Sequence, residues 1–176
     1  MRLNAPFASL DSPVIPRNMR WHAGALIRVV ASGHETSGEM AGIECIVQRR
    51  LEPPPHAHTR EDEAVFVLDG EVEFTIGRKR VRADPGEWVF LPRGVRHSFT
   101  LRSEHAHLLM MFTPSGIENF FEVLSEPAED EIIPASSLSY DNLFDMEYIM
   151  HVGQQFGIKF YPAKPARAAM TRSAAA

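Results

Sequence analysis

The chain has 176 residues, 44% of them hydrophobic, and a formal net charge of −5 at pH 7. This length and composition predict one globular domain with a substantial core. The acidic balance offers no basic surface for nucleic acid or an anionic membrane, and no stretch reaches the roughly 20 apolar residues of a membrane span. Cys45 is the single cysteine and cannot form an internal disulfide, and the N-terminus lacks a signal-peptide pattern. We therefore expect a cytoplasmic protein without nucleic-acid or membrane partners.

Most of the chain reads as short strands that follow an irregular beginning. Residues 1–22 contain three prolines and little periodicity, which predicts an N-terminal arm. Alternating or continuous apolar patterns predict strands at residues 25–31, 41–50, 64–68, 71–76, 80–83, 88–91, 97–101 and 106–112. Short strands at roughly 8–12-residue spacing, with turns between them, indicate an antiparallel sandwich or barrel.

Helical patterns begin only after the last predicted strand. Ser115 and Glu118 have the spacing of a capping box, and the apolar residues that follow recur at helical intervals. A second helix is expected over residues 139–156, with Gly157 placed to end it. The predicted organisation is an arm (1–22), a β-barrel (23–113), a helical extension (114–162) and a disordered tail (163–176).

Three histidines and one glutamate form the most informative pattern in the chain. His56 and His58 are two residues apart, so on a strand their side chains leave the same face. Glu63 follows five residues after His58, and His97 opens a later predicted strand. Imidazole and carboxylate groups are the ligands that hold divalent first-row metals. We therefore predict that His56, His58, Glu63 and His97 bind one metal ion.

The spacing of these residues resembles the two motifs of the cupin superfamily. The first motif reads His56-Ala57-His58, four residues, Glu63, six residues, Gly70. The second reads Gly86, five residues, Pro92-Arg93-Gly94, two residues, His97. Two positions depart from the family pattern, because Arg50 replaces a glycine and Leu101 replaces an asparagine. Neither position supplies a metal ligand. The run Arg60–Gly70 and the segment Phe112–Phe121 look like bacterial single-domain cupins similar to quercetin dioxygenase.

The resemblance implies a mainly β fold, a jelly-roll β-barrel of two antiparallel sheets with a short C-terminal helical extension. The four ligands would point into the barrel and hold Fe, Mn, Ni, Co, Cu or Zn as a divalent ion. Such proteins commonly form homodimers through edge strands, and their quercetinase-like members cleave flavonols with molecular oxygen. Glu63 would be both a metal ligand and the catalytic base, since it is the one carboxylate that the motif places to take a proton from a bound hydroxyl.

Three functions follow from this pattern as hypotheses. The first is a metal-dependent dioxygenase that acts on a small aromatic or enolisable compound. The second is an isomerase or lyase in which the metal polarises a carbonyl group. The third is a non-catalytic cupin that binds a small ligand. Fold-level analogy does not choose between them.

Several other residues could belong to a site, although a structural role is the simpler interpretation. Five apolar residues are candidates for the wall of a pocket: Phe66, Phe74, Phe90, Phe99 and Met110. Cys45 is expected to be a buried small hydrophobe rather than a reactive thiol.

Three further histidines and two arginines are expected at the surface. His105 and His107 form a second HxH pair without a carboxylate at ligand spacing, which favours an exposed strand entry. His151 is expected on the surface of the C-terminal helix. Arg93 and Arg96 flank the second motif and could meet an anionic substrate, although solvated arginines are more common.

Overall fold

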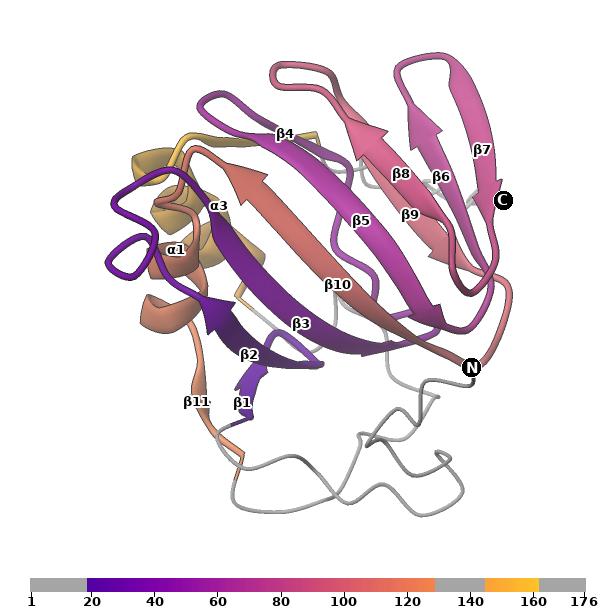
Figure 1. Cartoon of the computed structure of the whole chain (residues 1–176), viewed down its shortest axis with the longest axis horizontal. Coiled ribbons are helices and arrows are strands. Elements are labelled where there is room, and N and C mark those ends of the chain that lie inside the picture. Colours follow the sequence, from indigo (N-terminus) through magenta and orange to yellow (C-terminus); the bar gives the residue numbers. More distant parts are fainter. Residues whose placement is uncertain (1–18, 129–144, 162–176) are drawn as a thin grey trace, which may run out of the picture.

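The computed structural model describes residues 19–128 and 145–161. Two antiparallel sheets face each other as a sandwich, and the helices lie at one end of it (Figure 1). The mainly β fold of jelly-roll type is therefore confirmed. The terminal segments 1–18 and 162–176 lie outside the described residues, so the predicted disordered tail and most of the predicted arm remain predictions.

Seven strands form the larger sheet. Its spatial order is β11 (Glu126–Pro127), β1 (Arg20–His22), β2 (Ala25–Ala31), β3 (Ala41–Gln48), β10 (His105–Thr113), β5 (Asp62–Asp69) and β8 (Trp88–Leu91). Five strands form the smaller sheet, in the order β12 (Ile158–Phe160), β4 (His56–His58), β9 (His97–Leu101), β6 (Val72–Ile76) and β7 (Lys79–Ala83). Every strand predicted from the sequence is present.

Side-chain alternation along these strands places the core between the two sheets. On β5, Val65 and Val67 are buried and point inward, whereas Phe66 between them faces outward. The same parity puts Glu63 inward. Phe74 on β6 and Phe112 on β10 are fully buried and help to fill the space between the sheets. The period of two that predicts the strands thus also sets which polar side chains enter the interior.

Two short helices close one end of the sandwich. Helix α1 (Glu118–Val123) contributes the buried ring of Phe120, and helix α3 (Met146–Gln155) contributes Ile149 and Val152. Asp145 accepts a hydrogen bond from the Tyr148 amide and caps the start of α3. No helix in residues 19–128 or 145–161 has the length and apolar character to cross a membrane.

Three boundaries differ from the sequence prediction. The predicted irregular arm ends in a strand, because the turn at Ala23 and Gly24, both with positive φ, folds β1 back onto β2. Strand β3 ends at Gln48 rather than at residue 50, since Arg50 adopts a left-handed conformation with φ +76°. The predicted helical extension also contains a strand, β12, which pairs with the histidine-bearing β4.

The predicted capping box is wrong. Glu118 does not reach back to the Ser115 amide; its two oxygens accept from the amides of Gly116 (2.6 Å) and Gly33 (2.9 Å). The Ser115 hydroxyl donates to the Gly38 carbonyl instead of capping the helix. A tertiary contact with the loop between β2 and β3 thus replaces the local motif.

The second predicted helix is also shorter than expected. It begins at Met146 behind the Asp145 cap, not at residue 139, and residues 139–144 lie outside the described part. Its predicted end is confirmed, because Gly157 follows the helix with φ +82°. A side chain at that position would be strained and would also meet Thr59 and Arg60.

Candidate metal centre

The four predicted ligands come from both sheets. His56 and His58 occupy the two ends of β4, and His97 opens β9, the strand that pairs with β4 at His56. Glu63 lies on β5 of the opposite sheet. The alternation of β4 sends both histidines of the HxH pair to one face, and that face looks toward Glu63 across the interior.

The donor atoms of these four residues converge at one point. The Nε2 atoms of His56 and His97 are 3.2 Å apart. Glu63 Oε2 lies 3.4 Å from the Nε2 atoms of both His58 and His97. One ligand atom from each of the four residues can be chosen so that all lie within 4.8 Å of one another. Sequence spacing alone therefore identified a cluster that the fold assembles.

Backbone contacts fix the tautomers of two of these histidines. His56 Nδ1 lies 2.8 Å from the Pro54 carbonyl and His97 Nδ1 lies 3.1 Å from the Val95 carbonyl. Because a carbonyl only accepts, we assign the ring proton to Nδ1 in both residues. Each Nε2 then presents a lone pair, and the two lone pairs face each other and the Glu63 carboxylate.

Such an arrangement fits a bound cation. Without one, lone pairs and a negative charge would meet in a buried place, and among the described residues Glu63 Oε2 has no hydrogen-bond partner. Metal–nitrogen distances of about 2.0–2.1 Å place neighbouring ligands about 2.8–3.4 Å apart, from octahedral to tetrahedral geometry. The spacings of 3.2 and 3.4 Å found here fall within that range. The donor set is also one that divalent first-row metals accept.

Burial sets the protonation of the cluster. Desolvation lowers the pKa of His56, His58 and His97 to about 4. These imidazoles are therefore neutral at pH 7, the form that binds a metal. Desolvation also raises the pKa of Glu63 above its ordinary value, although the neighbouring His97 and His56 act in the opposite direction. A positive ion among these ligands would favour the ionised carboxylate.

A second buried carboxylate lies behind the cluster, and the sequence prediction missed it. Glu61 is buried, and its Oε2 lies 4.0 Å from the Nδ1 of His58. Neither atom has a hydrogen-bond partner among the described residues. Desolvation raises the pKa of Glu61. Carboxylates commonly orient a metal-binding histidine through its second nitrogen. The sequence could have indicated Glu61, because it lies between the predicted ligands His58 and Glu63.

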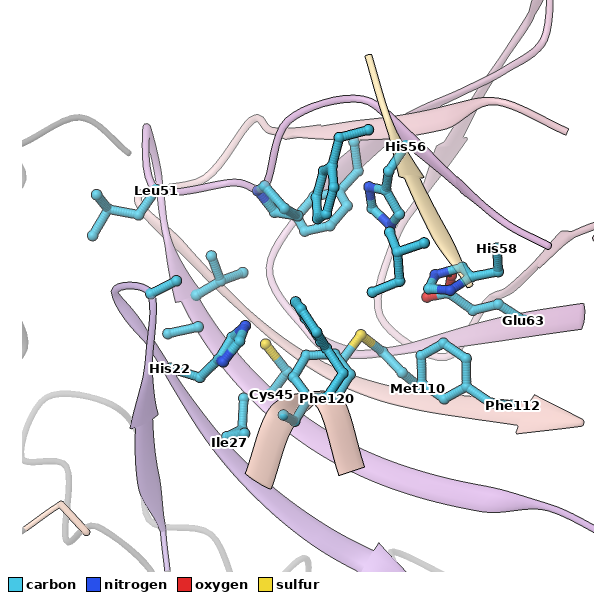
Figure 2. A pocket seen from close by; sticks show the side chains of 18 residues that line it. His22, Ile27, Cys45, Leu51, His56, His58, Glu63, Met110, Phe112 and Phe120 are labelled. Atoms are coloured by element: carbon cyan, nitrogen blue, oxygen red, sulfur yellow. The ribbon is translucent and has the colours of Figure 1, made fainter. Parts of the chain in front are cut away.

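An apolar cavity of about 80 Å³ opens beside the metal cluster. Figure 2 shows His56, His58 and Glu63 at one end of it, with Met110, Cys45 and Phe120 along its wall. The full set of lining residues is His22, Ala23, Ala25, Ile27, Cys45, Val47, Leu51, Pro53, His56, His58, Glu63, Phe99, Met110, Phe112, Phe120, Phe121, Ile158 and Phe160. A buried cavity with polar groups at defined places is the usual form of a small-molecule site.

The five predicted wall residues divide by strand parity. Phe99 and Met110 line the cavity, as predicted. Phe74 is fully buried but packs elsewhere in the core, 5.9 Å from Phe99 between ring centroids. Phe66 and Phe90 face outward, and Phe90 is 59% exposed. Phe74 therefore has the structural core role that was the simpler interpretation. Phe66 and Phe90 are not wall residues, because an apolar strand that is covered on one face only still carries apolar side chains on the other.

The other single residues are also placed by the structure. Cys45 is buried, and burial raises the pKa of its thiol to about 12, so it is an inert wall residue as expected. His151 is exposed. Arg93 pairs with Asp62, with 3.2 Å between Nη2 and Oδ2. Arg96 lies over the ring of Tyr161.

The expectation of an exposed second HxH pair fails for His107. His107 is buried, and its Nε2 lies 2.8 Å from Glu44 Oε1. Arg28 donates two hydrogen bonds to the other oxygen of the same carboxylate. Burial would raise the pKa of Glu44, but these hydrogen bonds hold it below its ordinary value. The carboxylate comes from the neighbouring strand β3, so spacing within one strand could not reveal it.

Comparisons with known proteins agree with the fold. A family model described as "Cupin domain" matches residues 42–112. The chain is 24% identical to quercetin 2,3-dioxygenase of Bacillus subtilis (strain 168) over 120 residues, which are 67% of this chain and 36% of that protein. It is 34% identical to an uncharacterized protein of Aquifex aeolicus (strain VF5) over 61 residues, which are 35% of this chain and 50% of that protein. The chain thus spans about a third to a half of the length of these relatives.

Among solved structures, the chain is similar to an RmlC-like cupin from Shewanella frigidimarina NCIMB 400. The TM-score is 0.51 at 17% sequence identity, and the match covers 68% of this chain and 99% of that one. At this identity the likeness shows a shared fold.

Proposed function

The chain belongs to the cupin superfamily, and on that premise we propose that it is a metal-dependent oxygenase acting on a small aromatic or enolisable compound. The convergence of three imidazoles and one carboxylate beside an apolar cavity carries this proposal. The similarity to a quercetin dioxygenase over 67% of the chain supports the choice of oxygen chemistry.

The residues around the cavity define what the protein itself would contribute. When bound, a divalent ion would supply a Lewis acid with coordination positions left for small oxygen ligands. The aromatic walls, Phe99 and Phe112 among them, would hold an apolar substrate body and keep water out. Low water content strengthens the electrostatic interactions inside the cavity.

Glu63 is the residue that we assign to proton handling. Its carboxylate is buried, faces the cavity and has an oxygen without a hydrogen-bond partner among the described residues. A substrate hydroxyl placed beside this carboxylate would lose its proton to it. His56, His58 and His97 would serve as ligands only, since burial keeps them neutral and two of them hold their ring proton toward a backbone carbonyl.

Oxygen consumption tests the proposal directly. Protein purified without chelators is analysed for metal, and oxygen uptake is then followed with a panel of flavonols, diketones and catechols. We expect uptake by the wild type and none by His97→Ala, while His151→Ala, an exposed histidine, retains wild-type uptake. Equal substrate turnover with and without oxygen would contradict the oxygenase and favour the isomerase or lyase.

We also propose that the protein is a homodimer joined at strand β8. This strand is the edge of the larger sheet, and two of its outward side chains, Trp88 and Phe90, are 53% and 59% exposed. An open edge with large apolar side chains is a common pairing surface. In sedimentation velocity the wild type should be dimeric and Trp88→Asp shifted toward monomer. A monomeric wild type would contradict this proposal.

A further inference from the structure

The cavity beside the metal cluster has a second polar end, at His22. This residue is the last of strand β1 and is 7% exposed. In Figure 2, His22 lies across the cavity from His58 and Glu63, with the side chains of Cys45 and Met110 between them. Most of the remaining lining is apolar, so His22 is the polar group furthest from the ligand cluster in this view.

One nitrogen of His22 has no hydrogen-bond partner. Its Nδ1 is buried and, among the described residues, unpaired. The ring itself is held in place by edge contacts with Phe121 and Phe120, whose centroids lie 4.9 and 5.4 Å away. Buried polar atoms are nearly always paired, and leaving one unpaired is costly. A partner supplied by a bound molecule would remove that cost.

The other nitrogen of His22 is engaged by the protein. The ring hydrogen-bonds the backbone of Leu124, and since Nδ1 has no partner, we assign this bond and the ring proton to Nε2. Burial lowers the pKa of His22 to about 4, so the imidazole is neutral at pH 7. Nδ1 is then a buried hydrogen-bond acceptor without a partner among the described residues, and its complement is a donor such as a hydroxyl group.

His22 also lies at a boundary between two hollows. A larger outer cleft of about 570 Å³ is lined by His22 and Ala23 and by residues of α1, β11 and α3. His22 and Ala23 are the residues that this cleft shares with the inner cavity. A molecule that enters from the outer cleft would pass His22 before it reaches the ligand cluster.

We propose that His22 is a specificity-determining residue that binds a hydroxyl or N–H donor at the end of the substrate remote from the metal. This inference rests on the proposed function and narrows it. The substrate class is a compact molecule with a metal-chelating oxygen pair, an apolar middle and one distal hydrogen-bond donor.

The size of the cavity restricts the substrate further. At about 80 Å³, the cavity is small beside the roughly 300–1,000 Å³ of typical small-molecule sites, so it favours a compact substrate. A singly substituted catechol or a short enolisable diketone with a terminal hydroxyl fits the size and both polar ends.

Matched catechols separate the role of His22 from that of the metal. The first pair is 4-(hydroxymethyl)catechol and 4-ethylcatechol, which differ by a hydroxyl in place of a methyl group. The second pair is the hydroxyethyl and propyl homologues, which extend the reach by one carbon. Dissociation constants are measured without oxygen on the Zn(II)-loaded protein, by calorimetry. The catechol head is common to all four probes, so its contribution cancels within each pair.

In the wild type, at least one alcohol should bind more tightly than its alkyl partner, by about fivefold or more. His22→Phe, which keeps a ring against Phe120 and Phe121, should lose this preference and bind the alkyl catechols as well as the wild type does. His22→Asn retains a side-chain acceptor and should restore part of the preference. Equal binding within both pairs by the wild type, or no binding at all, would overturn the inference, as would a preference that survives in His22→Phe.

Thermal unfolding distinguishes specificity from a structural role. His22→Phe removes an unpaired buried nitrogen but also the hydrogen bond to the Leu124 backbone. These two changes oppose each other, so its melting temperature should stay close to that of the wild type. A large fall in the melting temperature with an unchanged preference would assign His22 to the fold and overturn the proposal. The binding measurements use no oxygen, so they test the role of His22 separately from the oxygenase. A protein that prefers the alcohols but takes up no oxygen would refute only the oxygenase proposal.

Discussion

Replacing one of the proposed metal ligands should remove the stability that a bound ion would provide. His58 is buried on β4, and its Nε2 lies 3.4 Å from Glu63 Oε2. An ion that binds only the folded chain adds RT ln(1 + [M]/Kd), which is about 2.7 kcal/mol at a free metal concentration of 100 Kd. For a domain of this size each kcal/mol raises the melting temperature by about 2–4 °C. The wild type should therefore gain about 5–11 °C on saturation with metal.

The variant His58→Ala should lose most of this gain. Losing one of four ligands weakens the site, so the metal-dependent rise in melting temperature should shrink to a few degrees or less at the same metal concentration. The metal-free variant will also be less stable, because a buried ring is deleted and a cavity remains. For that reason the quantity compared is the difference between the loaded and metal-free melting temperatures, which does not depend on the stability of the metal-free protein.

The assay is differential scanning fluorimetry after dialysis against a chelator, with and without added Zn(II), Ni(II) or Mn(II). His151→Ala is the matched control, since it removes an exposed imidazole from α3 and should show the full wild-type gain. If His58→Ala shows the same gain as the wild type and retains a full complement of metal, the assignment of His58 as a ligand is refuted.

Three more predictions follow from other contacts. Arg50 is exposed and has φ +76°, so Arg50→Gly should stabilise the protein by about 0.5–1 kcal/mol in urea unfolding. This gain is the strain relieved at the left-handed backbone minus the cost of a more flexible unfolded chain. A loss of stability would contradict this prediction. Glu61→Met should raise the metal Kd about 10–100-fold in competition with a chromogenic chelator, with Glu61→Gln between it and the wild type; equal Kd values would exclude a positioning role. For the three ligand histidines, the folded pKa of about 4 lies below the unfolded value of 6.5, so the unfolded chain binds more protons between these values and the metal-free protein should lose stability as the pH falls from 6.5 to 4. The raised pKa of Glu63 opposes part of this loss. The measurement is urea unfolding at pH 7 and pH 5, and equal stability at the two pH values would show that the histidines are not buried as described.

The strands and the His56–His58 pair could be predicted because each depends on local spacing, and the spacing of the second cupin-like motif added His97. The HxH pair needs only a strand to put both rings on one face, and the polar stretch before Glu63 allows the chain to cross to the other sheet. Arg50 departs from the family glycine, yet the backbone there still adopts the left-handed conformation. Leu101, the second departure, is buried in the core.

The rest depends on contacts between distant segments, which spacing does not reveal. His22 belongs to the cavity because the turn at Ala23–Gly24 pairs β1 with β2, and nothing in the proline-rich arm marks that histidine. Glu44 reaches His107 across a strand pair. Glu118 leaves the expected capping box because the Gly33 amide, 85 residues away, offers it a partner.

Glu63 lies on one sheet and the three histidines on the other, so the affinity for a bound ion would depend on how the two sheets are placed relative to each other. A substitution deep in the core, such as one at Phe74, touches no ligand, yet it can tilt or slide one sheet relative to the other. A few tenths of an ångström of such movement separates the carboxylate from the imidazoles. Metal affinity in a series of core variants would therefore record inter-sheet displacement that melting temperatures alone do not resolve.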